Sequence, residues 1–470
     1  MDMPVGDIVP EVVVILTAVG ALLLASFTSE RRQWLVAPLA LAGLAVAGFI
    51  LSWQSEEARL TFSGTWAIDG ASVWARLMIL AGTILAILMS PDWFRTDKRH
   101  GEYYAILLFS ALGAMVLAGA ADLLQLVMGV LLSSVTGYTL AAYHRDWPLS
   151  VESGMKYFLV GAFANAILVV GVTLVFGMAG ATGYGEIAAN LPDLAPSPLL
   201  LLGLALVVIG VAFKLGAVPA HTWVPDIAEG APAPAAAFLT VVPKIGAAIA
   251  LFRLVELFPP EAFTIRPLIA ILAVATMTLG NLAALWQDDM RRMLGWSSVS
   301  QSGYALMAVA VVGLSDSALS ALLIFLVGYA LSNLAAFAVI AHLRGRTTRE
   351  DYKGLASARP FVAITLIVAL LSLVGIPPLA GFFGKLTLFL ATIDGGYAWL
   401  AVVALANTVI SLFYYLRFVA PVCFAAGDAP IAVLGRWTVI AVAVSAAGVI
   451  GFGLAGEIIF AAVTQAQLYQ

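Results

Sequence analysis

Long apolar runs, separated by short polar connections, follow one another along the whole chain. Each run holds about 20 residues, the length that an α-helix needs to cross the hydrocarbon core of a bilayer. The pattern predicts an all-α polytopic membrane protein with about 14 transmembrane helices. The expected segments lie near residues 8–27, 34–53, 72–90, 103–120, 121–143, 155–178, 197–217, 231–254, 267–286, 297–314, 317–341, 360–391, 396–418 and 437–458. The N-terminal stretch has no basic region like that of a cleaved signal and is expected to begin the first helix.

One segment, 360–391, is too long for a single crossing and contains the run Gly375, Ile376, Pro377 and Pro378. Proline removes a backbone donor, and glycine tolerates conformations that end a helix. We therefore expect a broken helix here, with its unwound backbone buried in protein or facing water.

Two groups of five segments share a pattern. Segments 4–8 and 9–13 each have, as their fourth helix, an apolar segment with a lysine beside a Pro/Gly cluster, which predicts that helices 7 and 12 are both broken. Because each group crosses the membrane an odd number of times, the two five-helix repeats are expected to be inverted. The expected divisions are 1–102 for helices 1–3, 103–258 and 259–420 for the two repeats, and 421–470 for helix 14.

Composition narrows the possible functions. Hydrophobic residues make up 62% of the chain, charged residues 11%, and the net charge of −4 argues against a nucleic-acid partner. The single cysteine, Cys423, excludes a disulfide framework, and the four histidines are too scattered for a metal site. Nucleotide-binding glycine motifs are missing from the sequence. We expect the lipid bilayer as a partner and no cofactor or metal bound by this chain.

The basic residues predict which way the chain is inserted. Most of the 23 Lys and Arg residues follow segments 1, 3, 5, 9, 11 and 13: Arg31, Arg32, Arg95, Lys98, Arg99, Arg145, Lys156, Arg291, Arg292, Arg344, Arg346, Arg349, Lys353, Arg359, Arg417 and Arg436. Arg59, Arg253 and Arg266 fall on the other side. By the positive-inside rule the richer side is cytoplasmic. An even number of crossings then places both termini on the periplasmic side of a bacterial inner membrane.

Three lysines, Lys214, Lys244 and Lys385, interrupt apolar segments. A charged side chain at the centre of a bilayer costs at least ~2.5–3.5 kcal/mol on insertion scales, so three of them indicate a function. Burial in a medium of low dielectric constant lowers the pKa of a lysine in general, which allows proton exchange near neutral pH. The sequence therefore predicts a proton or ion path. The alternative is that these lysines lie near helix ends and extend to the interface, which is easiest for Lys214 and hardest for Lys244.

Two further residues are weaker candidates. His221 lies in the polar connection between segments 7 and 8 and either relays protons or belongs to an ordinary loop. Glu152 is either a proton carrier or half of an i,i+4 pair with Lys156 at a helix start. Glu11, Arg76 and Asp122 are expected to be structural.

These motifs together resemble the antiporter-like subunits of respiratory complex I, the proton-translocating NADH:quinone oxidoreductase, and among them the subunit N family. The matching stretches run from Ser150 to Phe163, from Phe213 to Asp226, from Gly230 to Lys244, from Arg291 to Ser298 and from Gly375 to Lys385.

The resemblance implies a membrane-arm subunit with fourteen helices, inverted repeats and a chain of protonatable residues along the bilayer midplane. In that arrangement Lys214 lies in the inlet half-channel, Lys244 is the central relay and Lys385 leads to the outlet. NADH, flavin, iron–sulfur clusters and quinone are then expected in partner subunits. The partners expected in the membrane arm are neighbouring antiporter-like and small subunits.

One position departs from the family pattern. The family usually has a glutamate in the fifth helix, which pairs with the lysine equivalent to Lys214, and the aligned residue here is Leu131. Either another acid takes its place, with Glu152 and Asp122 as distant candidates, or the coupling differs. Two alternatives to a pumping complex I subunit follow: a subunit of a cation/proton antiporter or membrane-bound hydrogenase, and a scaffold paralogue that does not pump.

Overall fold

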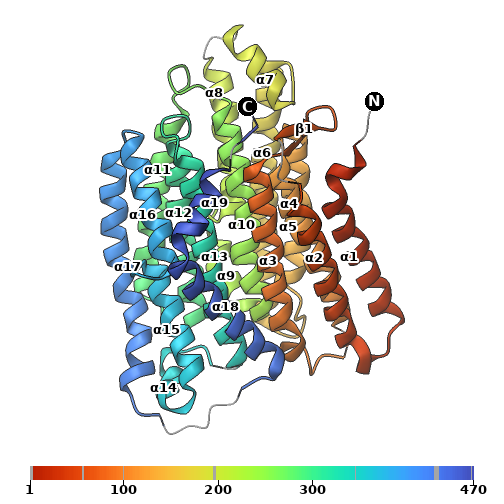
Figure 1. Cartoon of the computed structure of the whole chain (residues 1–470), viewed down its shortest axis with the longest axis vertical. Helices are drawn as coiled ribbons and strands as arrows, with labels where there is room; N and C mark the ends of the chain where they lie inside the picture. The colour runs from red at the N-terminus through yellow and green to blue at the C-terminus, as the bar shows by residue number, and fades with distance from the viewer. Residues whose placement is uncertain are drawn as a thin grey trace.

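The computed structural model describes residues 4–54, 58–98, 100–193, 197–344, 346–427, 433–466 and 468–469. Its helices run up and down through one bundle, and the start of α1 and the end of α19 lie at the same end (Figure 1). We call this end the termini side. We call the opposite end, where α3, α5 and α13 finish, the basic side, after the basic residues predicted there. Of those residues, Arg99 lies outside the described residues.

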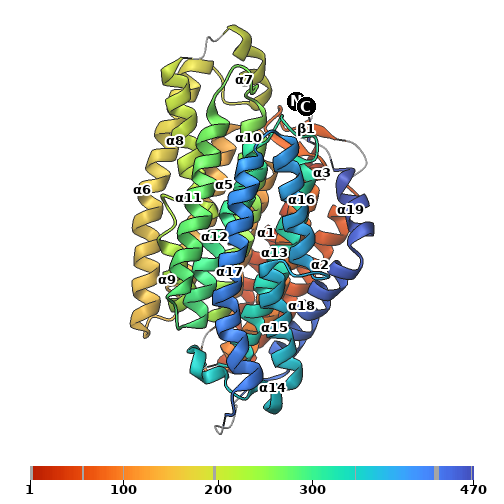
Figure 2. The same ribbon diagram turned by 90° about the vertical axis from the view of Figure 1, so that its left-hand side faces the viewer.

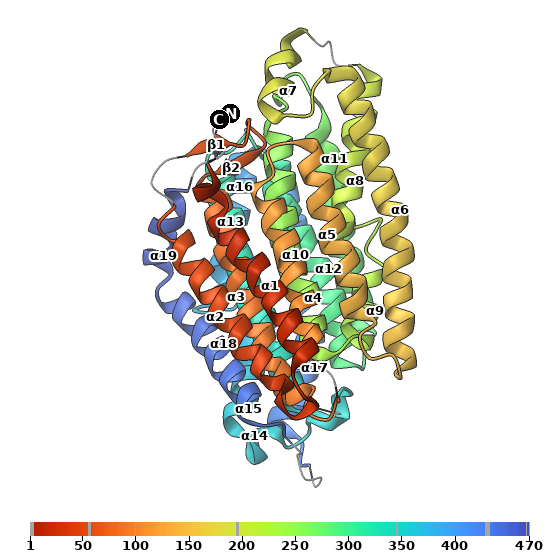
Figure 3. The same ribbon diagram turned by 90° about the vertical axis from the view of Figure 1, so that its right-hand side faces the viewer.

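Two N-terminal helices cover one flank of the bundle (Figure 3). The first elements are η1 (Val5–Ile8), α1 (Val9–Phe27), η2 (Glu30–Leu35), α2 (Val36–Leu51), the antiparallel strands β1 (Arg59–Thr61) and β2 (Trp66–Ile68), and α3 (Gly70–Trp93). Arg76 of α3 forms a buried ion pair with Glu11 of α1, with 3.1 Å between the charged atoms. Both residues are therefore structural, as expected.

The first repeat surrounds a buried central helix. It consists of α4 (Gly101–Gly119), α5 (Leu123–Ala141), α6 (Pro148–Ala179), α7 (Tyr184–Asn190), η3 (Leu191–Asp193), α8 (Pro198–Leu215), α9 (Trp223–Gly230) and α10 (Ala233–Glu256). The apolar window of α10 is buried along its whole length. By contrast, α6 runs along the outer edge beside α8 (Figure 2). At 32 residues it is about 48 Å long, more than one crossing needs.

The second repeat has the same number of crossings. It consists of α11 (Ile265–Leu285), α12 (Met290–Ala310), α13 (Ala318–His342), η4 (Arg349–Tyr352), α14 (Leu355–Ala358), α15 (Pro360–Val374), α16 (Ala380–Asp394) and α17 (Ala398–Phe424). After it, α18 (Arg436–Leu454) and α19 (Gly456–Thr464) return to the termini side.

Fourteen crossings can be traced in the described residues, as predicted. Twelve helices are long and apolar enough to cross a membrane by themselves. The helix α12 falls outside that set because it carries many hydroxyl side chains and two arginines, although it packs along α11. The short helices α15 and α16 cross together as one interrupted helix.

Helices 7 and 12 are both broken, as the sequence predicts. Helix 7 consists of α8 and α9, and helix 12 of α15 and α16. Each first half ends on a left-handed glycine, Gly216 with φ 67° and Gly375 with φ 98°. The two broken helices run in opposite directions, so α8 and α16 occupy the termini half of the bundle and α9 and α15 the basic half (Figure 1). The two breaks therefore lie in the middle of the bundle.

Candidate functional site

Lys244 lies in the middle of α10, and its ammonium group has three hydrogen-bond acceptors. Nζ donates to the backbone oxygen of Ser298 at 2.8 Å, to the Ser298 hydroxyl at 2.6 Å and to the Ser302 hydroxyl at 2.9 Å. The side chain is only 2% exposed, so it does not extend to the interface. All three donors of the ammonium are used, and hydrogen bonds to a charged group contribute about 1.5–3 kcal/mol each. The acceptors of this site are therefore all neutral oxygens.

The break in helix 7 forms one wall of the Lys244 site. The Ser302 hydroxyl also donates to the backbone oxygen of Leu215, the last residue of α8. A Cβ on Gly216 would lie 3.3 Å from Lys244 Nζ. The carbonyl end of a helix carries a partial negative charge, which stabilises a nearby cation. A Cβ on Gly216 would also lie 2.5 Å from Val224 Cγ2 at a φ of 67°, so this position favours glycine.

Lys385 lies at the other break and contacts its carbonyl end directly. It belongs to α16, and its Nζ donates to the backbone oxygen of Val374, the last residue of α15, at 2.9 Å. A Cβ on Gly375 would lie 3.2 Å from Lys385 Cδ. The ammonium also lies over the Tyr304 ring, 4.4 Å from its centre, which adds a cation–π interaction. Lys244 and Lys385 thus both lie against the carbonyl end of a broken helix.

Lys214 has a different environment. It lies in the last turn of α8, is fully buried, and donates to the Tyr157 hydroxyl of α6 at 3.2 Å. Its Nζ is 5.5 Å from the ring centres of both Tyr157 and Phe213. The Tyr157 ring also stacks on Trp223 of α9, at 4.4 Å between centres. Aromatic rings and one hydroxyl therefore surround this ammonium.

Among the described residues, Lys214 forms no ion pair. Leu131, which we align from the sequence with the family's glutamate, is half-buried in α5. Asp122 caps the start of α5 by accepting the backbone N–H groups of Leu124 and Gln125, and Glu152 pairs elsewhere. Neither of the two acids considered as substitutes contacts Lys214.

Glu152 belongs to an ion-pair network at the basic side. It lies 2.7 Å from Lys156, and Lys156 lies 3.1 Å from Asp226 of α9. Arg292 of α12 joins the network at 2.8 Å from Asp226 and 2.6 Å from Glu229. The Glu152 side chain is 56% exposed. The network therefore holds α6, α9 and α12 together at the surface, and the i,i+4 pair considered for Glu152 is present.

His221 lies in the unwound break between α8 and α9. Its side chain is buried, its ring centre is 5.8 Å from that of Trp296, and Nδ1 has no hydrogen-bond partner. The break brings His221 into the same unwound segment as Gly216, but no hydrogen bond joins it to any of the three lysines within the described residues.

Several partners of the lysines are not apparent from the apolar pattern. These are the hydroxyls of Ser298, Ser302 and Tyr157, the Tyr304 ring and the Val374 carbonyl. For the hydroxyls of Ser298 and Ser302, the one sequence signal is the low apolarity of α12. A helix that crosses the membrane with many hydroxyl groups must find hydrogen-bond partners for these groups inside the protein. The carbonyl has no sequence signal, since every residue has one.

Within the described ranges, no group of three or more His, Cys, Asp or Glu side chains is arranged to hold a metal ion. Cys423 is free and exposed.

Comparison with known proteins places these features in a family. Residues 120–411 match the family described as NADH:quinone oxidoreductase/Mrp antiporter, TM. NADH-quinone oxidoreductase subunit N of Mycobacterium sp. (strain JLS) is 47% identical over 402 residues, which is 85% of each chain.

Solved structures share the fold. A chain of respiratory complex I from Thermus thermophilus with bound aureothin has a TM-score of 0.83 and 30% identity, covering 97% of this chain and 100% of that one. A chain of the Mrp complex from Dietzia sp. DQ12-45-1b has the same TM-score at 21% identity, covering 98% and 97%. The second likeness is one of fold alone.

Proposed function

The chain belongs to the NADH:quinone oxidoreductase/Mrp antiporter membrane family, within its group of NADH-quinone oxidoreductase subunits N, and from this premise we propose that it translocates protons as a membrane-arm subunit. Lys214, Lys244 and Lys385 carry the protons across the middle of the bilayer, in that order. Electron transfer from NADH to quinone takes place in partner subunits, which hold the NADH, flavin, iron–sulfur clusters and quinone.

The observation that supports this most is how Lys244 and Lys385 are held. Both side chains are at most 4% exposed, and each ammonium is bound by neutral oxygens, with no carboxylate bound to it among the described residues. A buried ion pair strongly opposes loss of the proton, because the carboxylate would be left buried and unpaired. Neutral acceptors impose no such penalty. These two sites are therefore suited to release and regain protons.

The remaining candidates have smaller roles in this proposal. His221 lies buried in the break that also borders Lys244 and serves as a secondary proton carrier. Glu152, on the exposed network, serves only at the basic-side surface.

The basic side faces the cytoplasm of a bacterial cell, both termini face the periplasm, and the neighbours are antiporter-like and small membrane subunits.

Proton transport by the intact complex tests the proposal. The complex is purified with its partners, reconstituted into liposomes, and protons moved per electron pair are measured for the wild type and for Lys244→Ala. We expect the ratio to fall in Lys244→Ala because the central carrier is missing. The matched control is Lys353→Ala, which removes an exposed lysine whose partner is Glu350 and is expected to leave the ratio unchanged.

An unchanged ratio in Lys244→Ala would refute the relay. It would instead support a scaffold that does not pump, the alternative favoured by the lack of a carboxylate at Lys214. Copurification with flavin and iron–sulfur subunits is expected. Association with small antiporter subunits alone would support the cation/proton antiporter alternative.

A further inference from the structure

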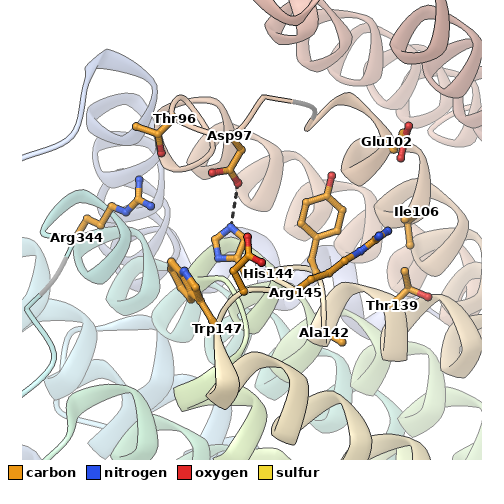
Figure 4. A pocket seen from close by; sticks show the side chains of 12 residues that line it. Thr96, Asp97, Glu102, Ile106, Thr139, Ala142, His144, Arg145, Trp147 and Arg344 are labelled. Carbon is orange, nitrogen blue, oxygen red and sulfur yellow. Dashed lines mark hydrogen bonds and ion pairs between the residues drawn. The ribbon is translucent and has the colours of Figure 1, made fainter.

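A cavity of about 640 Å³ opens at the basic side, where α3, α5 and α13 end and α4 begins. Its lining includes Asp97, Glu102, His144, Arg145, Trp147 and Arg344 (Figure 4). None of these residues has a role in the relay proposed above. In the proposed orientation the cavity faces the cytoplasm, from which protons are taken up.

A histidine–aspartate pair stands inside this cavity. His144 Nε2 lies 3.0 Å from Asp97 Oδ2 (Figure 4). The His144 side chain is 9% exposed, its Nδ1 is buried without a partner, and its ring centre lies 4.0 Å from that of Trp147. The pair joins the α3–α4 connection to the α5–α6 connection. It therefore places a titratable imidazole, with one nitrogen unused, in the lining of the cavity.

The helix α5 both lines part of the cavity and packs against the tyrosine that binds Lys214. Thr139 of α5 and Ala142, just after the end of α5, line the cavity, and Tyr138, next to Thr139 in the sequence, packs its ring at right angles on Tyr157, at 4.8 Å between centres. The Tyr157 hydroxyl accepts the hydrogen bond from Lys214. Two packed tyrosine rings therefore link α5, which lines part of the cavity, to the first lysine of the relay.

Buried hydroxyls without partners lie along the same helices. The Tyr138 hydroxyl lies near Ser134 and Asn165 but has hydrogen-bond geometry with neither. The hydroxyls of Tyr104, on α4, and of Ser133, on α5, are also buried and unpartnered. Buried polar groups of this kind normally bind ordered water. The helices beside the cavity therefore carry hydroxyls that can bind water inside the protein.

We propose that this cavity is the proton-uptake site for Lys214, with His144 and Asp97 as the groups that capture the proton. Tyr138 and Tyr157 are positioning residues that align the path to the amine. The inference rests on the proposed function. The imidazole binds a proton from the cytoplasmic water and passes it to water, and the Lys214 amine accepts a proton at the other end. Only N–H and O–H bonds form and break, and no electron moves.

The groups facing His144 set the charge of the site. The described titratable and charged residues that line the cavity beside it are Asp97, Glu102, Tyr143, Arg145, Asp146 and Arg344. Acids and bases are mixed, so the cavity is not a strong binding site for either an anion or a cation. Such a surface suits a group that must load and unload a proton.

The test uses the reconstituted complex. We measure two quantities for His144→Asn, Asp97→Asn, Tyr157→Phe and Lys214→Ala. The first is the number of protons moved per electron pair. The second is the pH dependence of proton uptake between about pH 5 and 8, where imidazoles titrate. The control is Glu350→Gln, a carboxylate on the same side whose 60% exposed side chain lies outside the cavity. We expect the two cavity variants and Tyr157→Phe to lower the ratio to that of Lys214→Ala, and Glu350→Gln to match the wild type.

The pH profile separates proton capture from a structural effect. We expect the pH dependence of proton uptake to change in His144→Asn and to stay as in the wild type in Tyr157→Phe, which keeps the imidazole. A wild-type ratio and profile in both His144→Asn and Asp97→Asn would overturn the uptake site. If Lys244→Ala still lowers the ratio in that case, the relay stands and only this inlet fails.

Discussion

At the scale of single residues, the three buried lysines have three different chemical environments. Lys244 has two hydroxyls and a carbonyl as acceptors, Lys385 has one carbonyl and an aromatic ring, and Lys214 has one phenol. The number of acceptors sets how strongly the charged form is stabilised. The one hydrogen-bond acceptor of Lys214 is a phenol, and Lys214 is also the lysine whose family partner is expected at residue 131, where this chain has leucine.

Introducing the carboxylate at residue 131 tests the importance of that replacement. Ser134 and Tyr138 lie three and seven residues after Leu131, on the same face of α5. Tyr138 packs against the ring of Tyr157, whose hydroxyl binds Lys214. In Leu131→Glu we expect more protons per electron pair than in the wild type, because the anion favours protonation of Lys214. The matched control is Leu131→Gln, which has the same shape without the charge. Equal ratios in the two variants would show that the missing carboxylate does not limit transport.

At the scale of elements, the broken helices explain how two lysines stay buried. An intact helix uses its carbonyls for its own hydrogen bonds, but a helix that ends in mid-membrane leaves its last carbonyls free. The Val374 carbonyl at the end of α15 accepts from Lys385 directly. The Leu215 carbonyl at the end of α8 accepts from the Ser302 hydroxyl, to which Lys244 donates. The left-handed glycines Gly216 and Gly375 end the two helices and keep the lysines close.

A comparison of two glycines tests this role. Gly375→Ala adds a Cβ 3.2 Å from Lys385 Cδ at a φ of 98°, and we expect it to lower the protons moved per electron pair. Gly180 ends α6 with a φ of 71° and has nothing within 4 Å of its Cβ position. Gly180→Ala therefore carries similar backbone strain, about 1–2 kcal/mol, without touching a lysine, and is expected to pump normally. If the two variants pump equally well, contact with the lysine is not the reason for the glycine.

At the scale of the whole molecule, buried ion pairs join parts of the chain that are far apart in sequence. Arg253 of α10 donates two hydrogen bonds, of 2.6 and 3.0 Å, to Asp69 at the start of α3. The backbone N–H of Tyr469 also donates to Asp69. Burial opposes ionisation of Asp69, but the Arg253 guanidinium and the Ser72 N–H outweigh it and hold the pKa of the carboxyl below its ordinary value. This site therefore fastens the central helix, α3 and the C-terminal segment together at the termini side.

Removing the charge of Asp69 is expected to weaken this junction. Asp69→Asn leaves Arg253 buried and unpaired, which destabilises a protein by about 3–5 kcal/mol. We expect a lower thermal midpoint of the purified complex at neutral pH. Because the folded-state pKa is lowered, the stabilisation is present above the ordinary pKa of the carboxyl and is lost as the pH falls through the lowered value. The difference between variant and wild type should therefore shrink in acid; a constant difference would contradict this account.

The surface carboxylate variant Glu350→Gln serves again as the control. It removes an exposed partner of Lys353 and should leave the thermal midpoint unchanged.

Much of the architecture could be predicted because the bilayer leaves few choices. Every backbone group in hydrocarbon must be paired, so apolar runs of about 20 residues become helices. The Pro/Gly clusters at Gly216 and Gly375 identify the two breaks because they stop a helix whatever surrounds them. The cost of burying ammonium groups in the same way singles out Lys214, Lys244 and Lys385 from the sequence alone.

The tertiary structure alone decided what those lysines contact. The Val374 carbonyl approaches Lys385 only because α15 ends beside α16, and Ser298 meets Lys244 across 54 residues of sequence. The tertiary structure also places Glu152 in an exposed network, away from the buried lysines. The sequence places Glu152 and the three lysines among the candidates. The physical reason is the distance along the chain over which each property is determined. Helix formation and burial cost depend on local composition, which the sequence states directly, whereas a hydrogen-bond partner depends on which helices pack together.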